Sequence, residues 1–235
     1  MTSLDGRIHD YLKQITYGGN DGIVTTFAIV AGFAGAEAQG VVGLGVLAVL
    51  IFGLANLTAD AVSMGMGEFL SGRSATELFR ARHAQVVDRV TRDPKTAAAS
   101  MAEHLVAQGL AREDARHTAD HLATSPTLMA DLVLRYDYGM EAPDSHNLRA
   151  RAFVTFLAFV FFGAIPLAPF VLLPENAGRF GWSVAATTLA LVLLGLLRTA
   201  ATGERAARSV AETVLVGGLC AVVAYLAGLF VAGLG

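Results

Sequence analysis

Residues 41–70 decide the fold, and they read VVGLGVLAVLIFGLANLTADAVSMGMGEFL. A helix needs about 20 predominantly apolar residues to cross the hydrocarbon core of a bilayer, and this stretch is longer than that. Its polar side chains are few, and Asn56, Asp60 and Glu68 recur at multiples of four residues, which places them on one helix face. The stretch therefore predicts a membrane-spanning helix with a polar stripe along one side.

The composition of the whole chain points the same way. Apolar residues make up 54% of the 235 residues and charged residues 16%, whereas soluble proteins have about 45–50% and about 25%. The net charge of −3 lacks the basic excess of nucleic-acid binders, so no nucleic-acid partner is expected. The single cysteine, Cys220, excludes an intrachain disulfide and a CxxC redox site. The composition indicates an integral membrane protein whose surroundings are the lipid bilayer.

Five stretches are apolar enough to span a bilayer, which predicts an all-α integral membrane protein with five transmembrane helices. They cover roughly residues 16–36, 41–70, 152–173, 182–197 and 210–234. Residues 1–15 are expected to form an amphipathic segment at the membrane surface, because they lack the long apolar run of a signal peptide.

Charge between the spans predicts their direction. Of the 17 Lys and Arg residues, 16 fall on the side that holds the N terminus, and basic residues are enriched on the cytoplasmic side. We expect a cytoplasmic N terminus and an external C terminus. Because arginine, alanine and glycine are abundant, a bacterial source is favoured, and the expected location is the bacterial inner membrane.

Residues 72–151 predict a small cytoplasmic helical domain inserted between the second and third spans, so that residues 16–71 and 152–235 form the membrane part. Asp93-Pro94 and Ser125-Pro126 are typical helix starts, and Gly109 and Gly139 are typical stops. The predicted helices are residues 94–108, 113–123 and 126–138, and the second span is expected to continue into this domain as one long helix.

Two aspartates at membrane depth are the strongest functional signal, because a charge at the bilayer centre costs about 2.5–3.5 kcal/mol on insertion scales. Asp60 shares its helix face with Asn56 and Met64, and Asp21 shares a face with Thr25 on the first span. The first two spans run in opposite directions. The two aspartates are therefore expected at a similar depth.

The oxygen and sulfur atoms of these side chains would bind some divalent metal ions better than others. Two carboxylates, an amide oxygen and a thioether suit Mn²⁺ or Fe²⁺, and the thioether disfavours Ca²⁺ and Mg²⁺. Such carboxylates also bind protons, so competition between metal and proton predicts antiport. The structural alternative is that Asn56 and Asp60 hydrogen-bond a neighbouring helix while Met64 fills space in the core.

Two motifs resemble the vacuolar iron transporter family: residues 21–32, DGIVTTFAIVAG, and residues 56–71, NLTADAVSMGMGEFLS. The similarity extends through residues 163–170 to Tyr225 and covers nearly the whole chain. The resemblance implies a homodimer of five-helix protomers that moves Fe²⁺, and often Mn²⁺ or other divalent ions such as Co²⁺ or Zn²⁺, out of the cytoplasm in exchange for protons. It implies a path between the first two spans at the dimer interface.

The resemblance also implies residue roles. The pore aspartate of the family falls on Asp21 and its pore methionine on Met64. The pore glutamate falls on Asn56, and a small residue of the family is replaced by Asp60, so the carboxylate is displaced by one turn on the same face. We expect the binding site to be kept, with altered selectivity.

The inserted domain departs further from the family. In plant-type members it concentrates metal on a cluster of glutamates and two methionines, and of the aligned residues here only Asp137 could bind a metal. We therefore expect the plant-type cytosolic metal store to be absent. The aligned positions are Val86, Arg89, Ala97, Ser100 and Asp137, with Val133 and Leu134 in place of the methionines.

Other polar residues are weaker candidates for metal binding or proton relay. His117 and His121 stand four residues apart and could hold Zn²⁺ if His104 or a partner supplied a further ligand, but a solvated helix face is the simpler interpretation. Glu212 follows Arg208 by four residues, which favours an ion pair over a proton relay. Thr25, Glu68 and Asp137 complete this weaker group.

The residues therefore favour a proton-coupled exporter of Fe²⁺ or Mn²⁺ with no permanently bound cofactor. The alternative is a membrane interaction or regulatory protein that keeps the scaffold without transport and uses the inserted domain for docking. The sequence shows no phosphate loop and no nucleophile elbow, so neither an ATP-driven pump nor an enzyme is expected.

Overall fold

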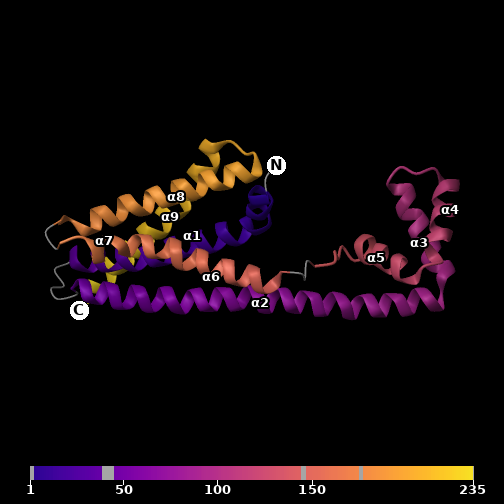
Figure 1. The fold of residues 1–235 in the computed structure, drawn as a ribbon, viewed down its shortest axis with the longest axis horizontal. Helices are drawn as coiled ribbons and strands as arrows, with labels where there is room; N and C mark the ends of the chain where they lie inside the picture. Colours follow the sequence, from indigo (N-terminus) through magenta and orange to yellow (C-terminus); the bar gives the residue numbers. More distant parts are fainter. Residues whose placement is uncertain (1–2, 39–44, 144–146, 175–176, 235) are drawn as a thin grey trace. The chain divides into compact units, whose positions relative to one another are not determined.

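The structure, a computed structural model, describes residues 3–38, 45–143, 147–174 and 177–234. The regular secondary structure of these residues is helical (Figure 1). The elements are α1 Ser3–Ala38, α2 Val46–Arg92, α3 Pro94–Ala107, α4 Arg112–Ala123, α5 Pro126–Asp137, α6 Leu148–Ala164, the 3₁₀ helix η1 Ile165–Leu167, α7 Ala168–Leu172, α8 Arg179–Thr202 and α9 Ala206–Ala232.

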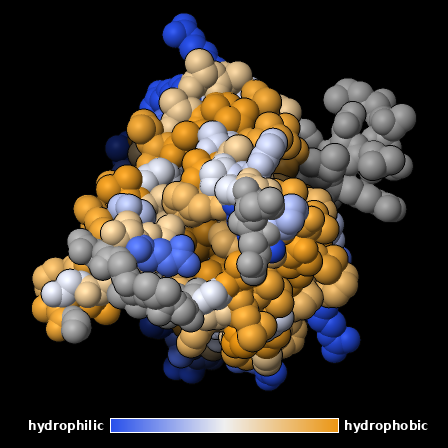
Figure 2. Space-filling view, turned by 90° about the vertical axis from the view of Figure 1, so that its left-hand side faces the viewer, coloured by the Kyte–Doolittle hydropathy of each residue, from blue (hydrophilic) through white to orange (hydrophobic). Residues whose placement is uncertain are grey.

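Five helical segments are long and apolar enough to cross a membrane, which confirms the predicted number of spans. They are Tyr11–Ala38, Val46–Arg92, Leu148–Leu172, Arg179–Ala200 and Ala206–Ala232. Residues 41–44, predicted to begin the second span, lie outside the described residues. Figure 2 views the molecule from its left-hand end in Figure 1, and hydrophobic side chains predominate there, with hydrophilic ones among them.

The chain divides into two compact units, which we call the membrane unit, residues 1–69 and 149–235, and the helical unit, residues 70–148. Helix α2 runs through both as one uninterrupted helix of 47 residues, as predicted (Figure 1). Residues 3–15, predicted as a separate surface segment, form the first turns of α1.

The third span is interrupted where proline predicts a break. Helix α6 ends at Ala164, and Pro166 lies in the 3₁₀ turn that precedes α7. Proline removes a backbone donor and disturbs the helical hydrogen bonds around it. The buried Ser183 of α8 donates its hydroxyl to the carbonyl oxygen of Pro166 at 2.7 Å, so the interruption also fixes α8 against this turn.

Close backbone contacts hold α1 in the membrane unit. A Cβ atom at Gly22 would lie 2.5 Å from the backbone oxygen of Phe159 in α6, so only glycine permits this approach. Ile23, fully buried beside it, packs in a cluster with Leu191 and Leu194 of α8. The residues that flank Asp21 on its C-terminal side are thus fixed by two neighbouring helices.

The helical unit has its own core, built around Val90, Met101, Met129 and Leu134. Its helices begin and end close to the predicted positions, and Asp93 caps α3 by accepting from the backbone N–H of Thr96 at 3.1 Å.

Two predicted stops are confirmed by positive φ angles, +101° at Gly109 and +61° at Gly139. The helix start predicted at Ser125-Pro126 is confirmed, because Ser125 is the N-cap residue of α5, although its side chain makes no cap hydrogen bond. Its backbone N–H instead donates to the carbonyl of Leu122 at 3.1 Å and completes the turn that ends α4, while Pro126 supplies the fixed φ that begins α5.

Candidate metal site

The polar stripe on α2 borders the face that packs into the membrane unit. A buried row of small and apolar residues, Gly53, Leu57, Ala61 and Gly65, follows the helix at four-residue spacing. The polar stripe lies beside this row, because Asn56, Asp60 and Met64 directly precede Leu57, Ala61 and Gly65 in the sequence. The side chains of the stripe are partly buried, and they are Asn56, Asp60, Met64 and Glu68. The four polar residues therefore share one face of α2, as predicted, and this face is neither fully exposed nor fully buried.

Asn56 and Asp60 are joined directly. The amide Nδ2 of Asn56 donates to Oδ2 of Asp60 at 2.7 Å, across one helical turn. In the described part of the chain the amide oxygen of Asn56 and the second carboxylate oxygen of Asp60 accept no hydrogen bond. Both oxygens are therefore available to a cation.

Asp21 of α1 is the other acidic side chain of these two spans. It is partly buried, and its charge and that of Asp60 repel each other. The hydroxyl of Thr25 donates to the backbone oxygen of Asp21 at 2.8 Å, so this side chain is bonded to its own helix. Two like charges in a membrane-spanning region favour a bound cation or proton between them.

Met64 contributes to packing as well as to the stripe. It contacts the buried cluster of Leu57, Ala61 and Phe159, which joins α2 to α6. Its thioether is thus partly buried one turn from Asp60. Among the described residues no group of three or more His, Cys, Asp and Glu side chains could hold a metal ion, so one copy of the chain offers only two carboxylates here.

Glu68, the last residue of the stripe, has strong protein partners. Arg151 of α6 donates to its Oε1 from Nη2 at 2.8 Å and from Nε at 3.0 Å, and Gln14 of α1 donates from Nε2 at 2.9 Å. The ion pair is largely buried, with exposed fractions of 23% and 21% for the two side chains. Glu68 therefore ties three helices of the membrane unit together.

Glu212 of α9 is also held by arginines. Its carboxylate pairs with Arg208 at 2.9 Å and with Arg198 of α8 at 3.1 Å. The predicted pair with Arg208 is present, and the second partner, Arg198, could not be recognised from spacing along one helix.

The candidate residues of the helical unit do not gather into one site. His117 and His121 are both exposed on α4, and their side chains have no partner in the described residues. His104 instead contacts the carboxylate of Asp137 and stacks on the ring of Tyr136, with 5.8 Å between ring centroids. A second pair that the sequence did not predict joins His83 to Asp131 at 3.1 Å.

The positions that align with the plant-type metal store do come together. A cavity of about 230 Å³ is lined by Arg89, Ala97, Ser100, Val133 and Asp137 among others. Arg89, Ala97 and Val133 occupy positions that align with ligands of that store. The Arg89 guanidinium disfavours a cation there, although the carboxylates of Asp93 and Asp137 also line the cavity. Val86 and Leu134 lie in the core of the helical unit.

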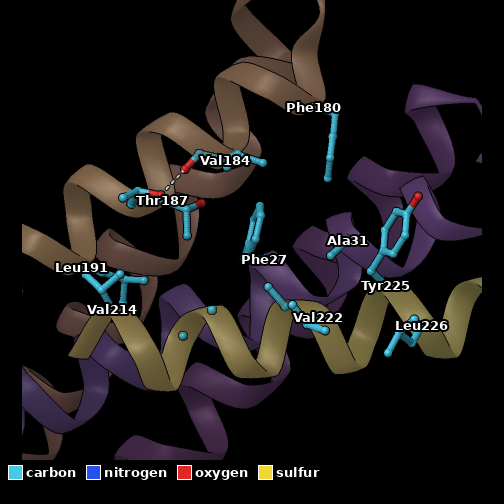
Figure 3. A pocket seen from close by; sticks show the side chains of 14 residues that line it. Phe27, Ala31, Phe180, Val184, Thr187, Leu191, Val214, Val222, Tyr225 and Leu226 are labelled. Atoms are coloured by element: carbon cyan, nitrogen blue, oxygen red, sulfur yellow. Dashed lines mark hydrogen bonds between the residues drawn. The ribbon is translucent and has the colours of Figure 1, made fainter. Parts of the chain in front are cut away.

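Two further cavities of the membrane unit are apolar. A groove of about 620 Å³ between α1, α2 and α9 has Asn56 among its lining residues. Another cavity, of about 410 Å³, lies between α1, α8 and α9, with Phe27 and Phe180 stacked across it at 6.4 Å (Figure 3). Thr188, one of its few polar residues, donates its hydroxyl to the Val184 carbonyl at 2.8 Å. These walls offer little to a metal ion.

Five helices long and apolar enough to cross a membrane define a membrane protein whose described elements are helical, with Asp21 and Asp60 inside two of the spans. Residues 12–229 match the model of the VIT family, and the chain belongs to that family. Vacuolar iron transporter 1 of Arabidopsis thaliana is 30% identical over 216 residues, which cover 92% of this chain and 84% of the relative. A vacuolar iron transporter of Toxoplasma gondii is 32% identical over 233 residues, which cover 93% of this chain and 74% of the relative.

Proposed function

We propose that this chain is a secondary transporter that exports Fe²⁺ or Mn²⁺ from the cytoplasm in exchange for protons. The observation that carries the proposal is the presence of two acidic residues, Asp21 and Asp60, inside membrane-spanning helices, where their charges repel each other. Each charge costs free energy at that depth, and a divalent cation offsets both. The names of the relatives, vacuolar iron transporters, support a metal as the transported substrate.

The donor set favours first-row divalent metals over Ca²⁺ and Mg²⁺. Asp21 and Asp60 would supply carboxylate oxygens, Asn56 its free amide oxygen, and Met64 a thioether one turn away. The thioether is a soft ligand that suits Fe²⁺, Co²⁺ or Zn²⁺ better than Mg²⁺. The remaining ligands would be water or side chains of a second copy, because we propose that the protein acts as a homodimer.

Proton coupling follows from the same carboxylates. A carboxylate must be deprotonated to hold a metal, so metal and proton compete for Asp21 and Asp60. A proton gradient across the membrane then drives metal release on the acidic side. We place the N terminus and the helical unit in the cytoplasm and the C terminus outside a bacterial inner membrane, because basic residues are enriched on cytoplasmic segments.

Flux through proteoliposomes tests this proposal. Purified protein is reconstituted with a metal-sensitive dye inside, and Fe²⁺, Mn²⁺ or Mg²⁺ is added outside while the pH gradient is varied. We expect flux of Fe²⁺ and Mn²⁺ that increases when the receiving side is acidic, with little flux of Mg²⁺. Absence of flux for every metal in either orientation would refute transport and would support the docking alternative instead.

A further inference from the structure

A cavity of the membrane unit has charged side chains in its wall, and none of the proposed metal ligands lines it. Its volume is about 620 Å³, and it lies between α1, α8 and α9. Lys13, Thr16 and Tyr17 of α1 line one side, and Arg198 of α8 and Glu212 of α9 line the other. Its two cationic side chains set it apart from the apolar cavities described above.

The cavity lies where three spans end. Lys13 is near the start of the span Tyr11–Ala38, Arg198 is near the end of Arg179–Ala200, and Glu212 is in the second turn of Ala206–Ala232. Spanning segments end at the level of the lipid headgroups. The cavity is therefore at headgroup depth, where a ligand can be half polar and half apolar.

The charges of the cavity leave it with a net positive balance. Glu212 is neutralised by Arg208 and Arg198, and Arg198 also contacts Glu204 at 3.5 Å. The ammonium group of Lys13 is exposed and has no ion-pair partner within the described ranges. This cation is available to an anion that enters the cavity.

Hydroxyl-bearing side chains lie beside Lys13 in the wall of the cavity. Thr16 and Tyr17 belong to the lining, about one turn of α1 beyond Lys13. Tyr17 is exposed, and its phenol can donate a hydrogen bond to an anion at this edge, whereas the Oγ1 atom of Thr16 is shielded from the cavity.

The apolar side of the cavity continues onto the outer face of α9. Val216 belongs to the lining, and its neighbours Leu215 and Leu219 are largely exposed. Acyl chains of a lipid could lie along these side chains while its headgroup fills the cavity. A free phosphate ion would gain nothing from this surface.

We propose that this cavity binds the phosphate headgroup of an anionic membrane lipid, with Lys13 and Arg198 as the cationic contacts. Phosphate oxygens accept charge-assisted hydrogen bonds from both groups and an ordinary one from the phenol of Tyr17. Basic cavities between membrane helices are a known setting for anionic headgroups. The proposal is independent of the metal site and of transport.

Lys13→Gln tests the proposal, with Lys95→Gln as the matched control. Lys95 is the other lysine of the chain, is exposed in the helical unit, and its replacement changes the net charge equally. The full chain is purified in detergent and titrated with phosphatidylglycerol, and binding is measured by native mass spectrometry and by the rise in melting temperature. We expect about fivefold weaker binding for Lys13→Gln and unchanged binding for Lys95→Gln.

The ligand series distinguishes lipid from phosphate. We expect phosphatidylcholine with the same acyl chains to bind more weakly, and glycerol 3-phosphate and inorganic phosphate not to stabilise the protein. Lys13→Arg should retain binding, which shows that the loss in Lys13→Gln reflects charge. Equal binding of Lys13→Gln and Lys95→Gln, equal binding of phosphatidylcholine, or equal binding of free phosphate would each overturn the proposal.

Discussion

Asn56 donates a hydrogen bond to Asp60 over 2.7 Å, from one turn of α2 to the next. The amide therefore orients the carboxylate that interacts with Asp21 of α1. A hydrogen-bond donor to a metal-binding carboxylate fixes the orientation of that carboxylate and affects metal affinity strongly. Asn56 is thus a positioning group for Asp60 as well as a candidate oxygen ligand.

Replacing Asn56 with alanine is expected to weaken metal binding about 10–100-fold, because Asp60 loses the donor that orients it. Thr58→Val is the control, since the Thr58 hydroxyl is exposed and bonds to the backbone of its own helix. Equilibrium binding of Mn²⁺ to the purified protein measures the effect. Unaltered affinity in Asn56→Ala would show that the hydrogen bond does not support the site.

Gly22 controls how closely α1 approaches α6 beside Asp21. Gly22→Ala would place a methyl group 2.5 Å from the Phe159 backbone oxygen, and overpacking of this kind typically costs about 1–3 kcal/mol. Gly67→Ala is the control, because no atom lies within 4 Å of a Cβ atom there. Thermal unfolding in detergent should show a lower melting temperature for Gly22→Ala and no decrease for Gly67→Ala. An equal melting temperature for both would contradict the packing.

Arg151 is expected to be structural. Arg151→Ala removes the cation and both guanidinium donors from the Glu68 carboxylate and leaves it the Gln14 donor, and losing charge-assisted hydrogen bonds of this kind costs about 1–3 kcal/mol. Unfolding by denaturant in detergent should show this loss. The exposed pair Arg73–Glu77 provides the comparison, and Arg73→Ala should have no measurable effect. If Arg151→Ala has the same free energy of unfolding as the unaltered chain, the ion pair between Arg151 and Glu68 is not structural.

Asp93 gives the helical unit a predictable pH dependence. Hydrogen bonds from the side chain and the backbone of Thr96 lower the pKa of the Asp93 carboxyl from its ordinary value. Because the folded pKa lies below the unfolded one, the stabilisation is complete above about pH 4 and disappears as the pH falls through the folded value.

Hydrogen exchange of the α3 amides in the full chain, measured from pH 7 to pH 3, tests this cap. Asp93→Ala should lose protection at pH 7. In the unaltered chain, protection should fall at low pH. Asp93→Asn should keep its protection at pH 7 and at low pH, because asparagine caps helices equally well and does not titrate. Identical pH profiles for the aspartate and asparagine forms would contradict the assignment.

Much of the fold could be predicted because its signals are local. The length of an apolar run predicts a span, and proline and glycine at fixed positions predict where α3 and α5 begin and end. The stripe of Asn56 and Asp60 could be predicted because helical periodicity alone places the two residues on one face.

The contacts between distant residues could not be predicted in the same way. Arg151 and Glu68 are 83 residues apart, and His104 and Asp137 are 33 residues apart. No spacing rule connects side chains on different helices, since their contact depends on how the helices pack. The resemblance aligned Asp137 with a metal ligand but did not indicate that His104 would contact it.

The central claim is that the displaced carboxylate of Asp60 carries the metal. Its most direct test is Mn²⁺ and Fe²⁺ flux through proteoliposomes that contain Asp60→Ala, Met64→Ala or Ser63→Ala, where the exposed Ser63 serves as the control. We expect metal flux to fall to the level of empty liposomes for Asp60→Ala, to be reduced for Met64→Ala, and to be unchanged for Ser63→Ala. Full flux through a correctly folded Asp60→Ala protein would contradict it.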